Sequence, residues 1–129
     1  MNRLEKLALI GGGAAILLAL GAARRPALFA GIERGLWEVT GVPGSAPQRL
    51  CLAEPLVLAQ FEHRLETCER DIVRDTRSVA EIHYRCSSRG FGRSTITALT
   101  PRSVRIETQG ISGGVPFNYL LQARRVGGC

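Results

Sequence analysis

The chain has 129 residues and a formal net charge of +6, and 45% of its residues are hydrophobic. This length fits one domain with a modest core and excludes an assembly of several domains. The basic residues are arginines, apart from Lys6, and they are spread along the chain rather than clustered. Such a distribution is typical of solvated strand faces and gives no reason to expect a nucleic acid as a partner.

An apolar run from Leu7 to Ala23 follows two basic residues near the N-terminus. It consists of Leu, Ile, Ala and Gly, and it ends in Gly21-x-Ala23, which has the small residues that a signal peptidase accepts. Residues 1–23 are therefore predicted to be a signal peptide, which places the protein in the bacterial periplasm or outside the cell. The run also reaches the lower length limit of a membrane-spanning helix, and two arginines follow it. An uncleaved anchor that holds the domain at the inner membrane, facing the periplasm, is therefore the alternative.

The chain after this segment is expected to be organised simply. Residues 24–34 should form an extended lead-in, because Pro26 blocks any continuation of the preceding helix. A single disulfide-bonded β domain is then expected from residue 35 to residue 129. No internal repeat or low-complexity segment interrupts it.

The first strand of this domain is expected at residues 35–40, with Trp37 and Val39 on one face. A tryptophan is large and needs a partner for its indole N–H, so Trp37 is interpreted as the anchor of this strand in the core. The alternative is a surface role, in which Trp37 and Glu38 bind a partner.

A second strand is expected at residues 49–53, after a turn rich in glycine and proline. A helix from Glu54 to Glu66 should follow, because a proline occupies its first turn and Leu58, Phe61 and Leu65 recur at helical spacing. This apolar stripe should lie on a sheet.

After the helix the hydrophobic period changes to two, which is typical of strands with one buried and one solvated face. If the first hairpin turns at Arg77, Ile72 lies opposite Ile82 and Arg70 lies opposite Tyr84. The strands expected in this part of the chain are 71–75, 79–86, 91–99, 103–108 and 117–126. Gaps of hairpin length favour an antiparallel over a parallel sheet.

The predicted fold class is therefore mainly β. We expect a meander of about seven antiparallel strands, strongly curved or partly closed, with one short covering helix and two disulfides. The residues expected in the core are Trp37, Val39, Leu50, Leu52, Leu58, Phe61, Ile72, Ile82, Tyr84, Ile96, Val104, Ile106, Phe117, Tyr119 and Leu121.

The domain contains four cysteines, and an exported domain keeps such residues oxidised. A hairpin that turns at Arg77 places Cys68 opposite Cys86, close enough for a disulfide. That leaves Cys51 to pair with Cys129. Four cysteines permit three connectivities, so this pairing rests on the hairpin register. The wide gaps between the cysteines fit a structural zinc site poorly, and no metal is expected.

The string from Gly110 to Gly114 matches the Gly-x-Ser-x-Gly pattern of a hydrolase nucleophile elbow. No helix is expected after Ser112, and no Asp, Glu or His follows it in the chain. A glycine-rich turn is the better interpretation, and neither a catalytic residue nor a cofactor is expected. A hydrolase that uses Ser112 or His63 is the alternative that enzyme assays would have to exclude.

The two histidines are expected to be solvated. His63 lies between Glu62 and Arg64 in the predicted helix, where it would form part of the polar face. His83 falls on the polar side of its strand, beside Glu81. Neither is expected to bind a metal or to transfer a proton.

The string at residues 35–40, Cys51-Leu52, Cys68, Cys86 and the terminal Gly127-Gly128-Cys129 together resemble a family of small exported bacterial proteins. This family is known as the domain of unknown function 3617. The resemblance covers nearly the whole mature domain. It implies an exported, disulfide-bonded domain, and it transfers no catalytic residue.

The function expected from the sequence is that of a non-enzymatic envelope module. It would bind an envelope protein or a small ligand through a sheet face or the mouth of a barrel. The alternative is a carrier of a small apolar ligand, in which a curved sheet encloses a cavity lined by Trp37, Phe117 and Tyr119.

Overall fold

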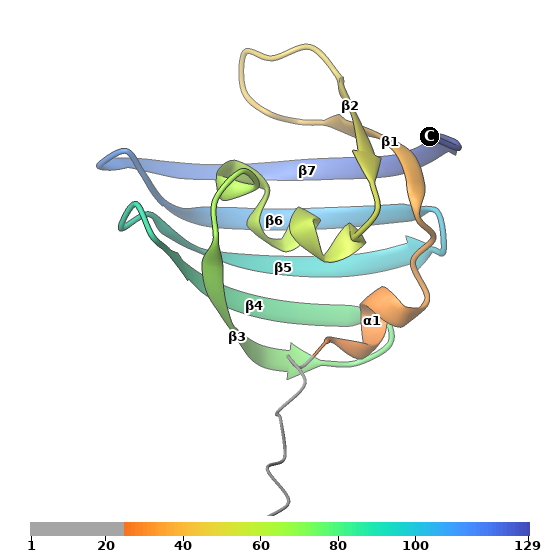
Figure 1. Cartoon of the computed structure of the whole chain (residues 1–129), viewed down its shortest axis with the longest axis horizontal. Helices are drawn as coiled ribbons and strands as arrows, with labels where there is room; N and C mark the ends of the chain where they lie inside the picture. The colour runs from red at the N-terminus through yellow and green to blue at the C-terminus, as the bar shows by residue number, and fades with distance from the viewer. Residues whose placement is uncertain (1–24) are drawn as a thin grey trace, which may run out of the picture.

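The computed structural model describes residues 25–129, so the predicted signal peptide or anchor at residues 1–23 lies outside the described residues. One antiparallel sheet, in the order β2-β1-β7-β6-β5-β4-β3, dominates the structure (Figure 1). Its strands are β1 (Gly35–Thr40), β2 (Gln48–Leu52), β3 (Cys68–Asp75), β4 (Val79–Cys86), β5 (Phe91–Thr100), β6 (Ser103–Ser112) and β7 (Val115–Gly127). The edge strands β2 and β3 do not pair with each other, so the sheet is open. The prediction of a mainly β fold with seven antiparallel strands is confirmed.

Two short helices, α1 (Ala27–Ala30) and η1 (Pro55–His63), lie across one face of the sheet (Figure 1). We call this the covered face and the opposite side the open face. Among residues 25–129, no helix has both the length and the apolar character needed to cross a membrane.

Helix α1 replaces the extended lead-in that was expected over residues 24–34, and that expectation was wrong. Pro26 has extended dihedral angles and caps the N-terminus of α1, and Leu28 and Phe29 are buried in the core. Proline ends one helix but is equally suited to begin another. A helix of four residues is too short to display an apolar period.

Helix η1 was expected as an α-helix from Glu54 to Glu66, but it is a 3₁₀ helix that is kinked at Gln60. The side chain of Glu54 caps its N-terminus by accepting from the Leu56 N–H at 3.1 Å. At three residues per turn, Leu58 and Phe61 share the buried side. The assignment of Leu65 to this stripe was wrong, because η1 ends before Leu65, which is 94% exposed.

The β3–β4 hairpin has the register expected from a turn at Arg77. Ile72 pairs with Ile82, and Arg70 pairs with Tyr84. The register then shifts between Ile72 and Arg74, which leaves Val73 exposed on the edge strand.

Both predicted disulfides are present. Cys68 and Cys86 face each other on β3 and β4 with 4.0 Å between their α-carbons. Cys51 of β2 is joined to Cys129, whose α-carbon lies 5.7 Å away. Each edge strand of the sheet is therefore held by a disulfide. Two disulfides indicate an oxidising, extracytoplasmic compartment.

The core fills the space between the covered face and the two helices. Trp37, Ile82, Ile96, Ile106 and Leu121 are fully buried there, as their alternation along the strands predicted. Expected core residues that are only partly buried are Leu50, Ile72, Phe117 and Tyr119. Core residues that the sequence did not single out are Leu28, Phe29, Ile32, Ala59, Ala80 and Ala123.

Candidate functional site

A groove of about 1000 Å³ crosses the open face where β4 ends, β5 begins, β6 ends and β7 begins. We call it the open-face groove. The charged and apolar side chains that line it include Arg85, Arg89, Phe91, Arg93, Ile111 and Pro116. The sequence did not single out these residues, because they come together only when four strands are in register.

Strand register builds one wall of the groove as a row of mainly apolar side chains. Arg85 of β4 pairs with Phe91 of β5, Phe91 pairs with Ile111 of β6, and Ile111 pairs with Pro116 of β7. Residues in register on neighbouring strands point to the same face. Phe91 is 49% exposed, although a large aromatic side chain is usually buried. This apolar row therefore presents an unshielded surface to solvent.

A second row, offset from the first by two residues in every strand, is polar. It consists of His83, Arg93, Gln109 and Asn118. His83 Nε2 donates a hydrogen bond to the Glu81 carboxylate at 3.0 Å, and the side chain is partly exposed, as its position on the polar side of the strand predicted. The Gln109 side-chain amide is oriented with its oxygen toward Arg93. In this orientation the oxygen accepts a hydrogen bond from Arg93 Nε at 3.2 Å. The groove thus has one apolar and one polar wall.

Between the two rows, Gly92 of β5 pairs with Gly110 of β6, and a side chain at Gly92 would point to the covered face rather than into the groove. A Cβ atom at Gly92 would lie 2.5 Å from the Tyr84 hydroxyl on the covered face. A Cβ atom at Gly110 would lie 2.0 Å from the carbonyl oxygen of Phe91. Both positions therefore exclude any side chain.

Positive charge at the groove exceeds negative charge. The Arg85 guanidinium lies 3.5 Å from Glu69 and 3.8 Å from Asp71, two exposed carboxylates. In the described part of the chain, no ion pair joins Arg89 or Arg93 to a carboxylate. Two guanidinium groups at the groove are therefore uncompensated.

Arg89 lies in the turn between β4 and β5, and its backbone is left-handed, with φ at 69°. It is the one non-glycine residue with positive φ among the described residues. Its N–H donates to the Cys86 carbonyl at 3.0 Å, and the Cys86 N–H donates to the Gly90 carbonyl at 2.8 Å. These bonds fix the turn and hold the Arg89 side chain at the rim of the groove.

A buried polar cluster lies on the covered face, on the other side of the sheet from the groove. His63 Nδ1 and the Tyr84 hydroxyl are 3.0 Å apart, and their rings meet edge to face. The Tyr119 hydroxyl donates a short hydrogen bond to the Glu62 carboxylate. Ser94 and Thr108, on β5 and β6, share a hydrogen bond of 2.8 Å between their hydroxyls.

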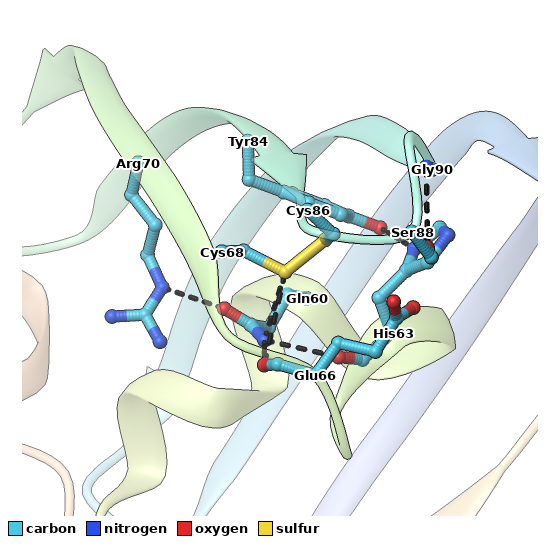
Figure 2. Close-up of a disulfide and its surroundings, with 9 residues drawn as sticks. All are labelled: Gln60, His63, Glu66, Cys68, Arg70, Tyr84, Cys86, Ser88 and Gly90. Atoms are coloured by element: carbon cyan, nitrogen blue, oxygen red, sulfur yellow. Dashed lines mark hydrogen bonds between the residues drawn. A yellow bond between two sulfur atoms is a disulfide. The ribbon is translucent and has the colours of Figure 1, made fainter.

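The prediction of a solvated His63 was wrong, because this side chain is only 3% exposed. The kink at Gln60 turns the end of η1 toward the sheet, and the Gln60 amide holds it there (Figure 2). Gln60 Nε2 donates to the carbonyls of His63 at 3.0 Å and Glu66 at 2.9 Å, while its Oε1 accepts from Arg70 Nε at 2.8 Å. A solvated His63 would have required a regular α-helix.

His63 Nε2 is the single buried side-chain polar atom without a hydrogen-bond partner among residues 25–129. It faces Gly90, where a Cβ atom would lie only 2.2 Å away. Because Gly90 covers this nitrogen, His63 cannot meet a substrate in the structure as it stands. Its position supports a structural role beneath the groove.

Burial raises the pKa of the Tyr84 hydroxyl, the negative charge of Glu62 raises it further, and a hydrogen bond with Thr108 opposes the increase. Burial also raises the pKa of Tyr119, together with the hydrogen bond to Glu62. Both hydroxyls therefore stay protonated at neutral pH.

Ser112 ends β6 and is followed by Gly113 and Gly114, whose φ angles are 56° and 78°. This is the glycine turn that the sequence predicted, leading directly from β6 into β7. The geometry of a nucleophile elbow, which needs a strand followed by a helix, is not formed at Ser112.

Trp37 is fully buried, and its indole N–H donates to the Glu33 carbonyl at 3.0 Å. Glu38 points to the other side of β1, where its carboxylate lies 3.4 Å from Arg49 and 3.8 Å from Arg124. A surface formed jointly by Trp37 and Glu38 is therefore not present.

Of the three residues expected to line an enclosed cavity, two lie side by side on β7 and the third lies apart from them. The rings of Phe117 and Tyr119 lie 5.5 Å apart, Phe117 also meets the buried His63 ring at 5.9 Å, and Trp37 is sealed in the core. The sheet is filled on its covered face rather than hollow. A carrier cavity lined by all three side chains is not formed.

Among residues 25–129, no group of three or more His, Cys, Asp or Glu side chains is placed to hold a metal ion. No family model, no curated protein and no solved structure matches the chain.

Proposed function

We propose that this protein is a non-enzymatic binding module of the bacterial cell envelope, and that it holds a small, largely apolar ligand in the open-face groove. The observation that carries this proposal is the half-exposed Phe91, in one row with Ile111 and Pro116. The volume of the groove, about 1000 Å³, lies at the upper end of the range for small-molecule sites. An apolar ligand would cover the surface that the apolar row leaves in water.

The chemistry of the lining favours binding over catalysis. The residues that line the groove include neither serine nor threonine, and Cys86 is held in a disulfide. Its histidine, His83, is engaged with Glu81. A nucleophile beside a general base, which covalent catalysis requires, is not part of this lining.

The proposed place of action is the bacterial periplasm or the space outside the cell. The two disulfides support an oxidising compartment, and the apolar run at residues 7–23 supports export. The resemblance to the exported family known as the domain of unknown function 3617 is part of the same proposal.

Titration of the oxidised protein with Nile red, a neutral apolar dye, tests this function. The wild-type protein should bind the dye with a rise in fluorescence, and Phe91→Ser should weaken binding about tenfold or more, which corresponds to about 1.4 kcal/mol. Leu99→Ser is the matched control, because Leu99 is an exposed residue at the opposite end of the same strand. Both variants should keep the wild-type melting temperature.

Failure of the wild-type protein to bind the dye would overturn the proposal. Equal binding by wild type and Phe91→Ser would also overturn it, since the ligand would then lie elsewhere. Mass spectrometry of the native protein purified from the periplasm would identify the natural ligand directly.

A further inference from the structure

We propose that the ligand of the open-face groove is a single-chain amphiphile with an anionic head, a carboxylate or a phosphate. Its head would bind to Arg89 and Arg93, and its chain would lie along the apolar row. This inference rests on the proposed function and adds the chemical class of the ligand.

The charges around Phe91 support an anionic head. Arg89 and Arg93 lie two residues before and two residues after Phe91, and Arg85 is its partner on β4. Asp71, the carboxylate at the groove, lies 3.8 Å from the Arg85 guanidinium. Arg89 and Arg93 are therefore the cations available to a ligand, and guanidinium groups bind carboxylate and phosphate oxygens in a two-pronged geometry.

The shape of the groove supports an extended chain. The apolar part of the row begins at Phe91, which lies between Arg89 and Arg93 in the sequence. It continues through Ile111 to Pro116. From β5 to β7 these three side chains cross two strand spacings, roughly 10 Å in all. Charge is thus concentrated at one end of an apolar surface that leads away from it, which matches the two parts of an amphiphile.

The backbone of Arg89 provides an independent reason to assign its side chain a role. A φ of 69° is strained for arginine and unstrained for glycine. Strained residues cluster at binding sites, where the side chain they carry is needed. The Arg89 backbone N–H is already bonded in the turn, and among residues 25–129 no hydrogen bond or ion pair engages its guanidinium.

Isothermal titration of the oxidised protein with dodecanoate, dodecyl phosphate and the neutral dodecanol tests the inference. The wild-type protein should bind an anionic ligand at least tenfold more tightly than dodecanol, and added salt should reduce this difference. A comparison of dodecanoate with dodecyl phosphate decides which anionic head is preferred.

Arg89→Gly and Arg93→Gln should each lower the affinity for the anionic ligands several-fold and leave the affinity for dodecanol unchanged. Arg89→Gly should also keep or raise the melting temperature, because glycine relieves the strain. Arg105→Gln is the matched control, since Arg105 is exposed on the open face of β6 outside the groove. This control should bind all three compounds as the wild type does.

Equal binding of dodecanol and the two anionic compounds would overturn the inference, while a positive result with Nile red would leave the proposed function intact. A lower melting temperature of Arg89→Gly with unchanged affinity would assign Arg89 a purely structural role and overturn its part in the site. If neither Nile red nor any of the three compounds binds, both proposals fail together.

Discussion

Gly90 and Gly92 lie at the start of β5, where side chains of the covered face press against the backbone. A Cβ atom at Gly90 would approach His63 Nε2 to 2.2 Å, and one at Gly92 would approach the Tyr84 hydroxyl to 2.5 Å. The hydrogen bond between His63 and Tyr84 thus fits beneath the groove only because both positions lack a side chain. The buried polar cluster therefore depends on these two glycines.

Gly90→Ala should therefore lower the free energy of unfolding by about 1 to 3 kcal/mol, the usual effect of overpacking a well-packed site. Gly128→Ala is the control, because a Cβ atom there would meet nothing within 4 Å, and its effect should stay within about 0.5 kcal/mol. Urea denaturation followed by circular dichroism measures both. Equal stability of the two variants would show that the turn can move away from His63.

Trp37 anchors β1 in the core through its buried ring and its hydrogen bond to the Glu33 carbonyl. Trp37→Ala should lower the free energy of unfolding by about 3 to 5 kcal/mol, as for other buried aromatic residues. Leu120→Ala, at a partly exposed position on the open face, should cost far less. Thermal denaturation of the two variants compares them, and a melting temperature of Trp37→Ala equal to the wild-type value would contradict its role as an anchor.

Tyr84 and Tyr119 make the stability of the fold depend on pH in the alkaline range. The pKa of each is raised in the folded protein, so the unfolded chain loses these protons first, from about pH 10 upward. Their contribution to stability is complete below that pH and is lost as the pH rises above it. Residues 25–129 contain no lysine and no free cysteine, so the two tyrosines dominate the titration in this range.

The midpoint of urea denaturation should accordingly fall as the pH rises above about 10. Tyr119→Phe should lower stability at neutral pH, because the bond to Glu62 is lost, and should make the alkaline decrease smaller. Tyrosinate absorbance, recorded in parallel, assigns the titrating groups. An alkaline decrease of the same size in Tyr119→Phe would exclude Tyr119 as a cause.

At the scale of elements, strands were predictable in more detail than helices. A period of two and a hairpin turn together constrain β3 and β4, so the pairing of Cys68 with Cys86 followed from the sequence. Helix α1 is too short for any period, and the i+3 spacing of Leu58 and Phe61 is shared by α and 3₁₀ helices. The groove is formed by rows of side chains that run across four strands. No single segment of the sequence therefore contains its pattern.

The two disulfides should contribute unequally to stability. The sequence separation is 78 residues for Cys51–Cys129 and 18 residues for Cys68–Cys86, and loop entropy assigns these about 4.5 and about 3 kcal/mol. Replacing both cysteines of a pair with alanine should therefore cost more for the first pair. Urea denaturation of the two double variants tests this order, and the reverse order would show that native packing around β3 outweighs loop entropy.

At the scale of the whole molecule, the sheet is open and has two edges, β2 and β3. Free edges invite pairing with other chains, and charged side chains discourage it. The edge strand β3 is rich in such residues: Glu69, Arg70, Asp71, Arg74 and Asp75. Charged side chains and the disulfides together protect the edges of this open sheet. A closed barrel needs no such protection, because it has no edge.

Amide hydrogen exchange of the oxidised protein should follow this topology. The central strands β5, β6 and β7 should exchange most slowly, and β2 and β3 fastest. Replacing Cys68 and Cys86 with alanine should accelerate exchange in β3 while β7 stays protected. Uniform acceleration across the sheet in that variant, measured by mass spectrometry of peptides, would show that the edge strand does not open independently.

The bond between Cys51 and Cys129 also determines how the molecule responds to mechanical force. It closes a covalent ring that contains η1 and β3 to β7. Tension applied between residue 25 and Cys129 passes through the sulfur atoms and bypasses every strand within the ring. Only the chain before Cys51 can then be drawn out, so β1 must separate from β7, while the four strands that line the groove are not themselves extended.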